Sequence, residues 1–390
     1  MPPDSILVIN TGSSSLKLGL YAMTSSLPAL LFNGQVDGIG QDAATLALED
    51  AQGNPLQTQN LTDTSQKSSL QALQKALDDA GAPHPAAIGH RVVHGGPHLT
   101  RHQRITPAVL EQLKGAIHFA PLHIPMALSL IEQATALYPD VPQFACFDTA
   151  FHTTMPESAA HYPLPRELYD AGIRRYGFHG LSYESIVRQL GTELPRRAVF
   201  AHLGSGASLA AVLHGQSIAT TMGLTPTGGI PMGTRPGDLD PGVLLHLLRT
   251  TYPTPDALEA MLNHEAGLKA LGGVSDMRKL QAVAKQGDTA AQLAIAIFTT
   301  AIAKSVAAFA VELGGLDLLV FAGGIGEHSP EVRQQVCTRL GFLGIQMDEG
   351  ANRAHAGILS TKDSATEVRI VPSEEDLQIA LHSAKLLATS

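Results

Sequence analysis

The chain has 390 residues, of which 44% are hydrophobic and 16% charged, a balance that predicts a folded protein of about two domains and excludes a disordered chain. Its formal net charge of −9 disfavours nucleic acid and anionic membranes as partners, because both are negatively charged. The two cysteines, Cys146 and Cys337, form no CxxC pair, so the sequence indicates neither a disulfide framework nor a zinc site.

The first predicted element is a buried strand at Ile6–Ile9, where apolar residues follow one another without interruption. This run is too short for a signal sequence, so we expect no secretion. A polar turn at 10–15 comes next, and leucines then alternate with other residues over 16–21. The alternation predicts a second strand, with Lys17 on the face opposite the leucines.

The region that follows carries few motifs. Residues 24–64 are polar, and we expect peripheral strands and loops there. Ser68–Ala80 has helical periodicity, and Ala86–His90 leads into a cluster of candidate site residues.

A second strand–turn–strand unit is predicted at Ala198–Leu213. Its turn contains Gly204-Ser205, which matches Gly12-Ser13 of the first unit. Two hairpins of similar design in one chain indicate a duplicated domain, although so short a match leaves duplication open.

A long apolar helix is predicted at about Ala290–Leu313. Polar residues interrupt it, so we interpret it as a core helix and not as a membrane span. With no secretion expected, this interpretation predicts a cytoplasmic protein.

The last predicted unit consists of a buried strand at Leu318–Phe321, a glycine loop at 322–328 and a helix that begins at Ser329-Pro330-Glu331. A strand, a glycine loop and a helix N-terminus together favour an anion site, because free backbone N–H groups face one point. The loop matches neither the GxxxxGKS nor the full GxGxxG pattern, so a P-loop or a Rossmann fingerprint is not indicated.

Four segments are dense in residues that could do chemistry: 89–96, 147–152, 176–180 and 223–242. Each also has a purely structural explanation. Arg91 could be a surface cation, Asp148 a helix cap, and His179 and His202 buried core histidines. Asp238 and Asp240 could shape a turn, and residues 374–376 could be the solvated first turn of the last helix.

Read together, these segments resemble the acetate/propionate kinase family of the actin, sugar-kinase and Hsp70 superfamily. The matching segments are VINTGSSSLK, GHRVVHGG, FDTAFH, YGFHG, HLGSGAS, GLTP, MGTR with GDLDPG, SDMR and GGIGE, in family order over about residues 6–382. The resemblance implies an α/β fold with two duplicated ribonuclease-H-like domains around a central cleft. The N-terminal domain would comprise residues 1–149 and about 378–390, and the nucleotide-binding domain 150–377. A homodimer is usual in the family.

The resemblance also implies site residues. Arg91, His179 and Arg235 would bind the carboxylate and the phosphoryl group, and Asp148 would be the catalytic acidic residue. Mg²⁺ would be held by Asn10 and Glu375. The acyl group would be bound by Arg91, Val93, Leu122, Phe178 and Pro226. The nucleotide would be bound by Asn10, Ser13, Ser15, Lys17, His202, Leu203, Gly204, Ser205, Gly206, Asp276, Met277, Arg278, Gly324, Ile325, Gly326, Glu327 and His328.

The implied activity is reversible, Mg²⁺-dependent phosphoryl transfer from ATP to acetate by direct in-line attack of the carboxylate, with Mn²⁺ as an alternative metal. The alternatives are a propionate kinase with the same mechanism and a nucleotide-dependent module without kinase activity, as in actin or Hsp70. Because a carboxylate is already ionised at neutral pH, we expect Asp148 to act through Mg²⁺ and by orienting arginine or water, and not as a base.

The chain departs from the usual family residues at several positions. Leu181 and Tyr183 replace Thr and His in the segment after YGFHG. The other departures are Ser205, Thr227, Gly228, Pro236, His328 and Glu374.

Overall fold

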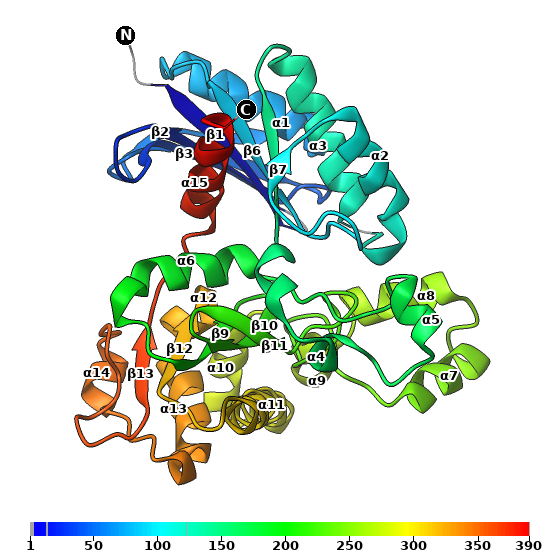
Figure 1. Ribbon diagram of the computed structural model, residues 1–390, viewed down its shortest axis with the longest axis vertical. Helices are drawn as coiled ribbons and strands as arrows, with labels where there is room; N and C mark the ends of the chain where they lie inside the picture. The colour runs from blue at the N-terminus through cyan, green and yellow to red at the C-terminus, as the bar shows by residue number, and fades with distance from the viewer. Residues whose placement is uncertain (1–3, 13–14, 122, 390) are drawn as a thin grey trace. The chain divides into compact units, whose positions relative to one another are not determined.

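The computed structural model divides into two compact units (Figure 1). Unit 1 comprises Met1–Ala150 and Glu374–Ser390, and unit 2 comprises Phe151–Ser373. The chain therefore leaves unit 1 once and returns to it with its last helix. The structure describes residues 4–389 apart from 13–14 and 122.

Unit 1 is built on one mixed sheet, whose described strands lie in the order β5-β4-β3-β2-β1-β6-β8-β7. Strands β1 to β5 form antiparallel neighbours, whereas β6 is parallel to β1 and β8 is parallel to β6. The strands are β1 (Ser5–Thr11), β2 (Ser15–Ala22), β3 (Ala29–Asp37), β4 (Ala44–Asp50), β5 (Pro55–Leu61), β6 (Ala87–Val92), β7 (Gln103–Arg104) and β8 (Gln143–Phe147).

Helices cover both faces of this sheet because its central strands are apolar on both sides. Leu7 and Ile9 of β1 pack in one core with α1 and α3. On the other face, a Cβ placed on Gly89 would meet Ile379 and Ser383 of α15. The helices of unit 1 are α1 (Gln66–Asp79), α2 (Pro107–Gly115), the 3₁₀ helix η1 (Ile117–Phe119), α3 (Ile124–Leu137) and α15 (Glu375–Leu387), and the 3₁₀ helix η2 (Ala150–Thr154) leads into unit 2.

Helix α1 confirms the helix predicted at 68–80 and begins two residues earlier. The Ser65 side chain caps it by accepting a hydrogen bond from the Ser68 N–H at 3.2 Å. Leu70, Leu73 and Leu77 lie on its buried face, as expected for residues three and four positions apart.

Unit 2 contains a smaller mixed sheet, whose described strands lie in the order β11-β10-β9-β12-β13. Strands β9, β10 and β11 are antiparallel neighbours, and β12 is parallel to both β9 and β13. The strands are β9 (Arg197–Leu203), β10 (Ala207–Leu213), β11 (Gln216–Thr220), β12 (Leu318–Ala322) and β13 (Glu367–Ile370).

The two sheets share one arrangement. The order and directions of β3-β2-β1-β6-β8 in unit 1 repeat in β11-β10-β9-β12-β13 of unit 2. The predicted hairpins correspond within this repeat, since β1 and β2 take the places of β9 and β10. The repeat confirms the predicted pair of duplicated α/β units, which the short sequence match had left open.

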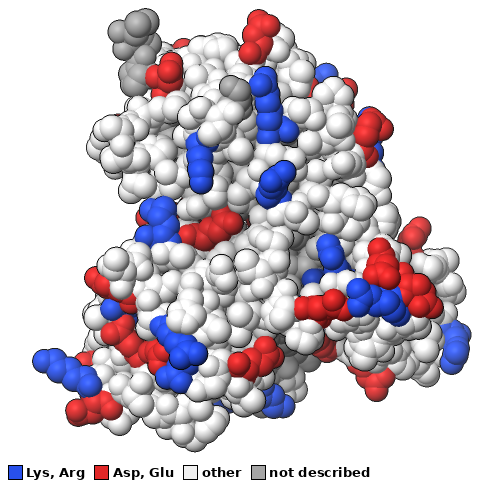
Figure 2. Space-filling model, in the orientation of Figure 1, with Lys and Arg blue, Asp and Glu red and all other residues white. Residues whose placement is uncertain are grey.

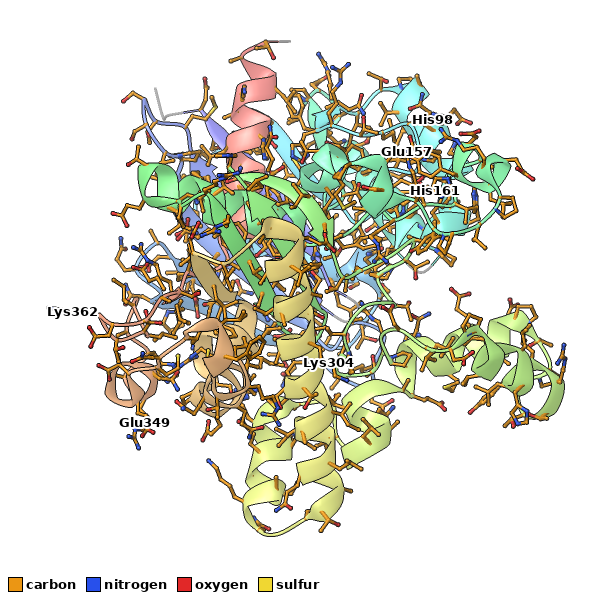
Figure 3. The ribbon with its side chains drawn as sticks, turned by 60° about the horizontal axis from the view of Figure 1, so that its bottom comes forward. His98, Glu157, His161, Lys304, Glu349 and Lys362 are labelled. Atoms are coloured by element: carbon orange, nitrogen blue, oxygen red, sulfur yellow. The ribbon has the colours of Figure 1, made fainter. Side chains whose placement is uncertain are left out.

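The long apolar helix α11 (Thr289–Leu313) is long and apolar enough to cross a membrane by length and composition, yet half of its most apolar window is buried within the protein. Phe298, Ile302 and Val306 on its inner face are fully buried against β9, β10 and neighbouring helices. Lys304 lies on its exposed face (Figure 3). In this structure α11 is the core helix of unit 2, as predicted.

The remaining helices of unit 2 surround this core. They are α4 (Glu157–Ala160), α5 (Arg166–Asp170), α6 (Gly180–Leu190), η3 (Gly191–Glu193), α7 (Pro241–Thr250), α8 (Pro255–His264), α9 (Gly267–Gly272), α10 (Met277–Lys285), α12 (Gly323–His328), α13 (Pro330–Arg339), η4 (Gly341–Leu343) and α14 (Glu349–Arg353).

The prediction of a glycine loop at 322–328 was wrong, because Gly323–His328 forms the short helix α12. Side chains bind both of its ends. The Glu327 carboxylate accepts from the Gly323 N–H at 2.8 Å, and Arg333 donates to the carbonyls of Gly326 and Glu327 at 2.8 and 2.9 Å. These bonds offset the poor helix propensity of glycine. The following helix is capped by Ser329, as predicted.

Several charged side chains on the surface form pairs of opposite sign. On the face drawn in Figure 2, Lys and Arg side chains are scattered among Asp and Glu. Arg166, for example, pairs with both Glu157 and Asp170. The drawn face therefore carries no continuous basic patch.

Candidate active site

In unit 1 the structure brings Arg91 and Asp148 together at the carboxyl ends of two parallel strands. Arg91 lies near the end of β6, and Asp148 directly follows β8. The guanidinium group grips the carboxylate with Nη2 at 2.6 Å from Oδ2 and Nε at 3.1 Å from both oxygens. Asp148 is only 1% exposed, so this charged, two-pronged contact lies in a largely dry environment.

The first turn of α15 adds further carboxylates to this group. The Asn10 side chain donates to Asp376 at 2.6 Å and accepts from Arg91 Nη1 at 3.3 Å. Glu375 lies 3.9 Å from the same nitrogen of Arg91. This turn is therefore a functional candidate and not a solvated helix end. Sequence reasoning missed Asp376, whose partner Asn10 is 366 residues away in the chain.

The pKa values of these groups reflect the crowding of charge. Burial lowers the pKa of Arg91, but the charges of Asp148 and Glu375 outweigh it and hold that pKa above its ordinary value. Burial raises the pKa of Asp376, and the nearby Glu375 adds to the effect. Arg91 therefore stays charged at any accessible pH, and Asp376 resists ionisation in the absence of a further cation.

The donor set fits Mg²⁺. The Asn10 amide and the carboxylates of Asp148, Glu375 and Asp376 are hard oxygen ligands in one group around Arg91. Three acidic residues lie beside one partly buried arginine there, which leaves an excess of negative charge that a divalent cation would balance.

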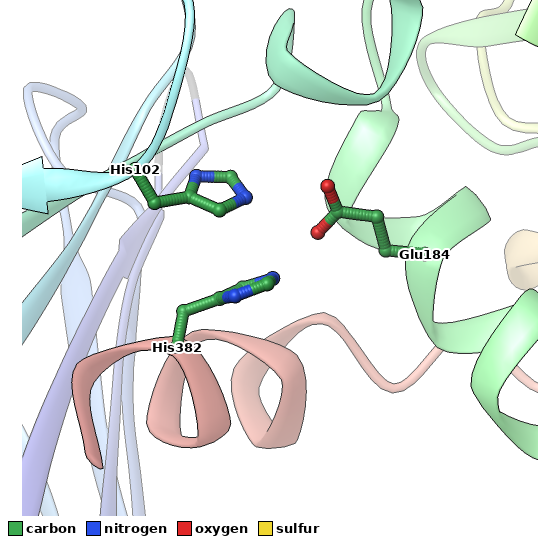
Figure 4. A group of neighbouring side chains, drawn as sticks. All are labelled: His102, Glu184 and His382. Atoms are coloured by element: carbon green, nitrogen blue, oxygen red, sulfur yellow. The ribbon is translucent and has the colours of Figure 1, made fainter. Parts of the chain in front are cut away.

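Two histidines of unit 1, His102 and His382, lie beside each other (Figure 4). His102 Nδ1 accepts a hydrogen bond from the backbone N–H of Phe147 at 3.0 Å. The His102 ring packs at 4.0 Å, centroid to centroid, against that of His382 on α15. These contacts fix the end of the strand that presents Asp148.

The rest of the predicted unit 1 set is placed as follows. Lys17 is exposed on β2 and pairs in register with Asn10 on β1, and Ser15 begins β2. Val93 follows β6 and is partly buried. Ser13 and Leu122 lie outside the described residues. The hairpin therefore brings Asn10 and Lys17 together, as the sequence predicts.

In unit 2, His179 occupies a strained position at the start of α6. Its φ of 60° lies in the left-handed region, which residues other than glycine seldom adopt. Its Nδ1 lies 2.8 Å from the Ser208 hydroxyl, and its ring stacks on that of His202 at 4.3 Å. The predicted histidines are therefore neighbours, and side chains hold both, since His202 also contacts Ser182 at 2.8 Å.

His152 holds the backbone before His179. It belongs to the FDTAFH segment, and the sequence analysis assigns it no role. His152 Nε2 lies 2.9 Å from the Phe178 carbonyl, and Nδ1 lies 2.8 Å from the Ser217 hydroxyl. Burial lowers the pKa of His152 to about 4, so the ring is neutral. Gly177 allows this approach, because a Cβ there would lie 2.6 Å from the ring and its φ is 75°.

Arg235 and His179 both face the turn between β9 and β10. A Cβ placed on Gly206 would lie 3.3 Å from His179 Nε2 and 3.7 Å from Arg235 Nη1. Arg235 also donates to the Pro226 carbonyl at 2.8 Å. The two predicted catalytic residues of unit 2, His179 and Arg235, therefore both lie beside the turn that is predicted to bind the nucleotide.

The other predicted nucleotide residues of unit 2 adjoin the same turn. Gly233 N–H donates to the Ser205 carbonyl at 3.2 Å, and a Cβ on Gly233 would lie 3.4 Å from the Ser275 carbonyl. A Cβ on Gly323, at the start of α12, would lie 2.8 Å from the Leu203 carbonyl. The turn therefore has α12 on one side and the start of α10 on another.

The side chains of this group differ in their hydrogen bonds and in their exposure. Asp276 caps α10 by accepting from the N–H groups of Arg278 and Lys279. Glu327 accepts from Gly323 and from the Ser373 N–H, so its carboxylate supports the backbone. The remaining predicted residues are exposed, partly buried or buried as follows: Ser205, Gly324, Arg278 and His328 exposed; Gly204 and Ile325 partly buried; Leu203, Met277, Gly326, Phe178 and Pro226 buried.

Comparison with known proteins gives a consistent answer. Residues 5–381 match the Acetokinase family. Acetate kinases from Rhodopseudomonas palustris and Nitrobacter hamburgensis are each 42% identical to this chain; the alignments cover 98% of it and 98% and 96% of the relatives. A solved propionate kinase from Francisella tularensis superposes with a TM-score of 0.92 at 35% identity, and the Porphyromonas gingivalis acetate kinase with 0.86 at 34%; both cover 98% of this chain and 100% of the other. These matches confirm the resemblance and the fold, and the chain belongs to the Acetokinase family.

Proposed function

We propose that this chain transfers the γ-phosphoryl group of ATP reversibly to the carboxylate of acetate, which gives acetyl phosphate and ADP. The proposal rests on membership of the Acetokinase family together with side chains that are suited to bind phosphate. His179 and Arg235 face the glycine turn of β9 and β10, and the partly buried Arg91 lies beside carboxylates in unit 1.

The chemistry needs charge stabilisation more than proton transfer. A carboxylate oxygen of acetate attacks the γ-phosphorus, the new C–O–P link forms, and the bond to the β–γ bridging oxygen breaks as ADP leaves. We assign the charge on the equatorial oxygens to Arg91, Arg235 and the ring N–H of His179. Each such donor contributes about 3–4 kcal/mol when it is preorganised in a dry site.

Asp148 serves to orient Arg91 in this scheme. Both of its oxygens accept from the guanidinium group, which holds the fork in one plane. Because acetate is ionised at neutral pH, the reaction has no proton for Asp148 to remove. A role as general base would be required only for an alcohol acceptor.

We assign Mg²⁺ to Asn10 and Glu375, with Asp148 and Asp376 close enough to act as further ligands or as partners of bound water. When bound, the ion neutralises the developing charge of the phosphates. The neighbouring Lys17 and Ser15 and the turns of unit 2 would bind the phosphates and the nucleoside. Mn²⁺ takes the same oxygen ligands and is expected to substitute.

Propionate is the second candidate substrate, because the propionate kinase of Francisella tularensis superposes so well. We assign the acyl group to Val93, Leu122, Phe178 and Pro226. One methylene in an apolar pocket changes binding by about 1–3 kcal/mol, so both acids are expected to react. Steady-state kcat/KM with acetate, propionate and butyrate ranks them, and a clear preference for propionate would replace acetate as the assigned substrate.

We further propose that the chain works in the cytoplasm as a homodimer. Helix α7, all of whose residues are described, has none that is buried, although Val243 and Leu245 are large and apolar. Exposed apolar residues that gather on one element are typical of protein interfaces. Sedimentation of the purified chain gives its mass in solution, and a monomer at micromolar concentration would contradict this part of the proposal.

Trapping of acetyl phosphate with hydroxylamine tests the activity itself. With ATP, Mg²⁺ and acetate we expect acetyl hydroxamate in amounts equal to the ADP formed. ATP hydrolysis without hydroxamate would favour a nucleotide-driven binding module. Phosphate release that does not depend on any organic acid would instead indicate a phosphatase.

A further inference from the structure

Tyr183 lies in a line of hydrogen bonds that ends at His179. Tyr183 is fully buried on the first turn of α6. Its hydroxyl lies 2.6 Å from Ser208 Oγ, and Ser208 Oγ lies 2.8 Å from His179 Nδ1. We refer to these three side chains as the Tyr183–Ser208–His179 relay. All of them belong to unit 2.

Hydrogen-bond chemistry favours one direction for the relay. The Ser208 hydroxyl is fully buried and carries one proton, so it can donate to only one of its two neighbours. A phenol is a stronger acid than an alkyl alcohol and hence the better donor. If Tyr183 donates to Ser208, the Ser208 proton is left for His179 Nδ1.

We propose that Tyr183 and Ser208 are positioning residues that hold His179 as the neutral tautomer with its proton on Nε2. If Nδ1 accepts a hydrogen bond, the proton of the neutral ring must lie on the other nitrogen. That nitrogen is the one that faces the turn at Gly206. The relay thus presents an N–H donor toward the place where the proposed function puts the phosphoryl group, and in this respect it rests on that function.

The surroundings of His179 favour a neutral donor over a charged one. His179 as a whole is 9% exposed, its ring stacks on His202 at 4.3 Å, and Arg235 faces the same turn. A second positive charge beside Arg235 in so buried a place would be costly. A neutral ring with a fixed N–H supplies the hydrogen bond without that cost.

The relay also explains how His179 keeps its strained backbone. A φ of 60° costs about 1–3 kcal/mol at a residue other than glycine, and it persists only where the surroundings hold it. The bond to Ser208 on β10 and the His152 bond to the preceding carbonyl fix the ring and the backbone from two sides. The strain is thus used to aim Nε2 at the turn.

Nitrogen NMR of the histidine rings tests the proposal without substrate. Protein labelled with ¹⁵N-histidine is recorded by long-range ¹H–¹⁵N correlation, and the His179 signals are assigned from their loss in His179→Gln. We expect the pattern of an Nε2–H tautomer in the native protein. In Ser208→Ala we expect a substantial Nδ1–H population. An Nδ1–H native ring, or a tautomer unchanged in the variant, would overturn the relay.

Tyr183→Phe, which removes one oxygen, keeps the test decisive if Ser208→Ala does not fold, and it should also raise the Nδ1–H population. Its matched control is Tyr176→Phe, because Tyr176 is also buried and donates to the Gly172 carbonyl. The control should leave the His179 signals unchanged. A tautomer shift of equal size in the control would mean that the effect is structural and would contradict the proposal.

Kinetics separate this inference from the proposed function. Loss of one buried hydrogen bond corresponds to roughly a tenfold change in rate. Ser208→Ala should therefore lower kcat about tenfold, while KM for ATP stays within about twofold. An Nε2–H ring in a protein that makes no acetyl hydroxamate would contradict the function and leave the relay standing. Hydroxamate formation with an Nδ1–H ring would contradict the relay alone.

Discussion

Arg91 is tied to three other side chains of unit 1, Asn10, Asp148 and Glu375, and its planar fork matters to each contact. Lysine would keep the positive charge but could not bond both oxygens of Asp148 in the same way. Arg91 is therefore expected to contribute both to substrate binding and to the stability of the fold. Changes at this site should affect turnover and folding together.

For Arg91→Lys we expect kcat to fall at least about a hundredfold, because the fork that meets the phosphoryl oxygens is lost. The melting temperature should also fall, because the buried Asp148 carboxylate loses some of the hydrogen bonds that it accepts from Arg91. Steady-state assays and thermal unfolding measure both. Arg197→Lys is the matched control, because Arg197 grips Asp317 in the same manner within unit 2. Arg197→Lys should lower the melting temperature and leave kcat unchanged. Near-normal turnover in Arg91→Lys would contradict the assignment of Arg91 to the phosphoryl oxygens.

Two buried histidines should make the protein sensitive to mild acid. Burial lowers the pKa of His90 and of His152 to about 4, whereas an unfolded histidine titrates near 6.5. Between these values the unfolded state binds more protons, so the free energy of unfolding falls as pH falls. By pH 4 the loss amounts to roughly 3 kcal/mol for each histidine.

Urea unfolding between pH 7 and pH 4.5 measures this loss. In His152→Gln the decline of the unfolding free energy with falling pH should be shallower, because one of the two groups is gone. His118→Gln is the control, since His118 is exposed on η1. If the unfolding free energy of His152→Gln depended on pH as in the native protein, protonation of His152 would not be a cause of the acid sensitivity.

At the scale of elements, helix α12 depends on a residue from the next helix. Arg333 of α13 is fully buried and donates to the carbonyls of Gly326, Glu327 and Asn352. Burial lowers its pKa to about 10, which leaves it charged at neutral pH. It thereby satisfies carbonyls at the end of α12 that have no partner within that helix.

Arg333→Met should destabilise unit 2 and loosen α12, because buried carbonyls lose their donor at about 1–3 kcal/mol each. Since α12 is a proposed nucleotide-binding element, KM for ATP should rise at least about fivefold, more than kcat falls. Arg339→Met on the same helix is the control, because Arg339 is exposed. An unaltered KM for ATP in a folded Arg333→Met protein would exclude α12 from nucleotide binding.

The elements also show how far local sequence reaches. Hairpins, α1, α11 and the cap of α13 were predicted because alternation, helical spacing and an N-cap serine are local signals. The helical state of 323–328 was not, because glycines favour a loop and the stabilising Arg333 acts from outside the segment. Asp376 and His152 were missed for a similar reason. Their roles depend on partners that only the fold brings near, such as Asn10 and Phe178.

For the whole molecule, the repeated strand order gives each unit its own set of predicted site residues. Each unit presents a hairpin turn, β1–β2 or β9–β10, beside the carboxyl ends of parallel strands. Arg91 belongs to unit 1 and Arg235 to unit 2. The sequence alone identified both arginines through the family resemblance. The central claim of the proposal is that both act on one transition state.

A double-mutant cycle on kcat tests that claim most directly. Arg91→Ala and Arg235→Ala should each lower kcat roughly a hundredfold to a thousandfold in the hydroxamate assay. If both arginines serve the same transferring phosphoryl group, the double variant should lose much less than the product of the two single losses. Losses that multiply fully, or near-normal turnover in either single variant, would contradict the account.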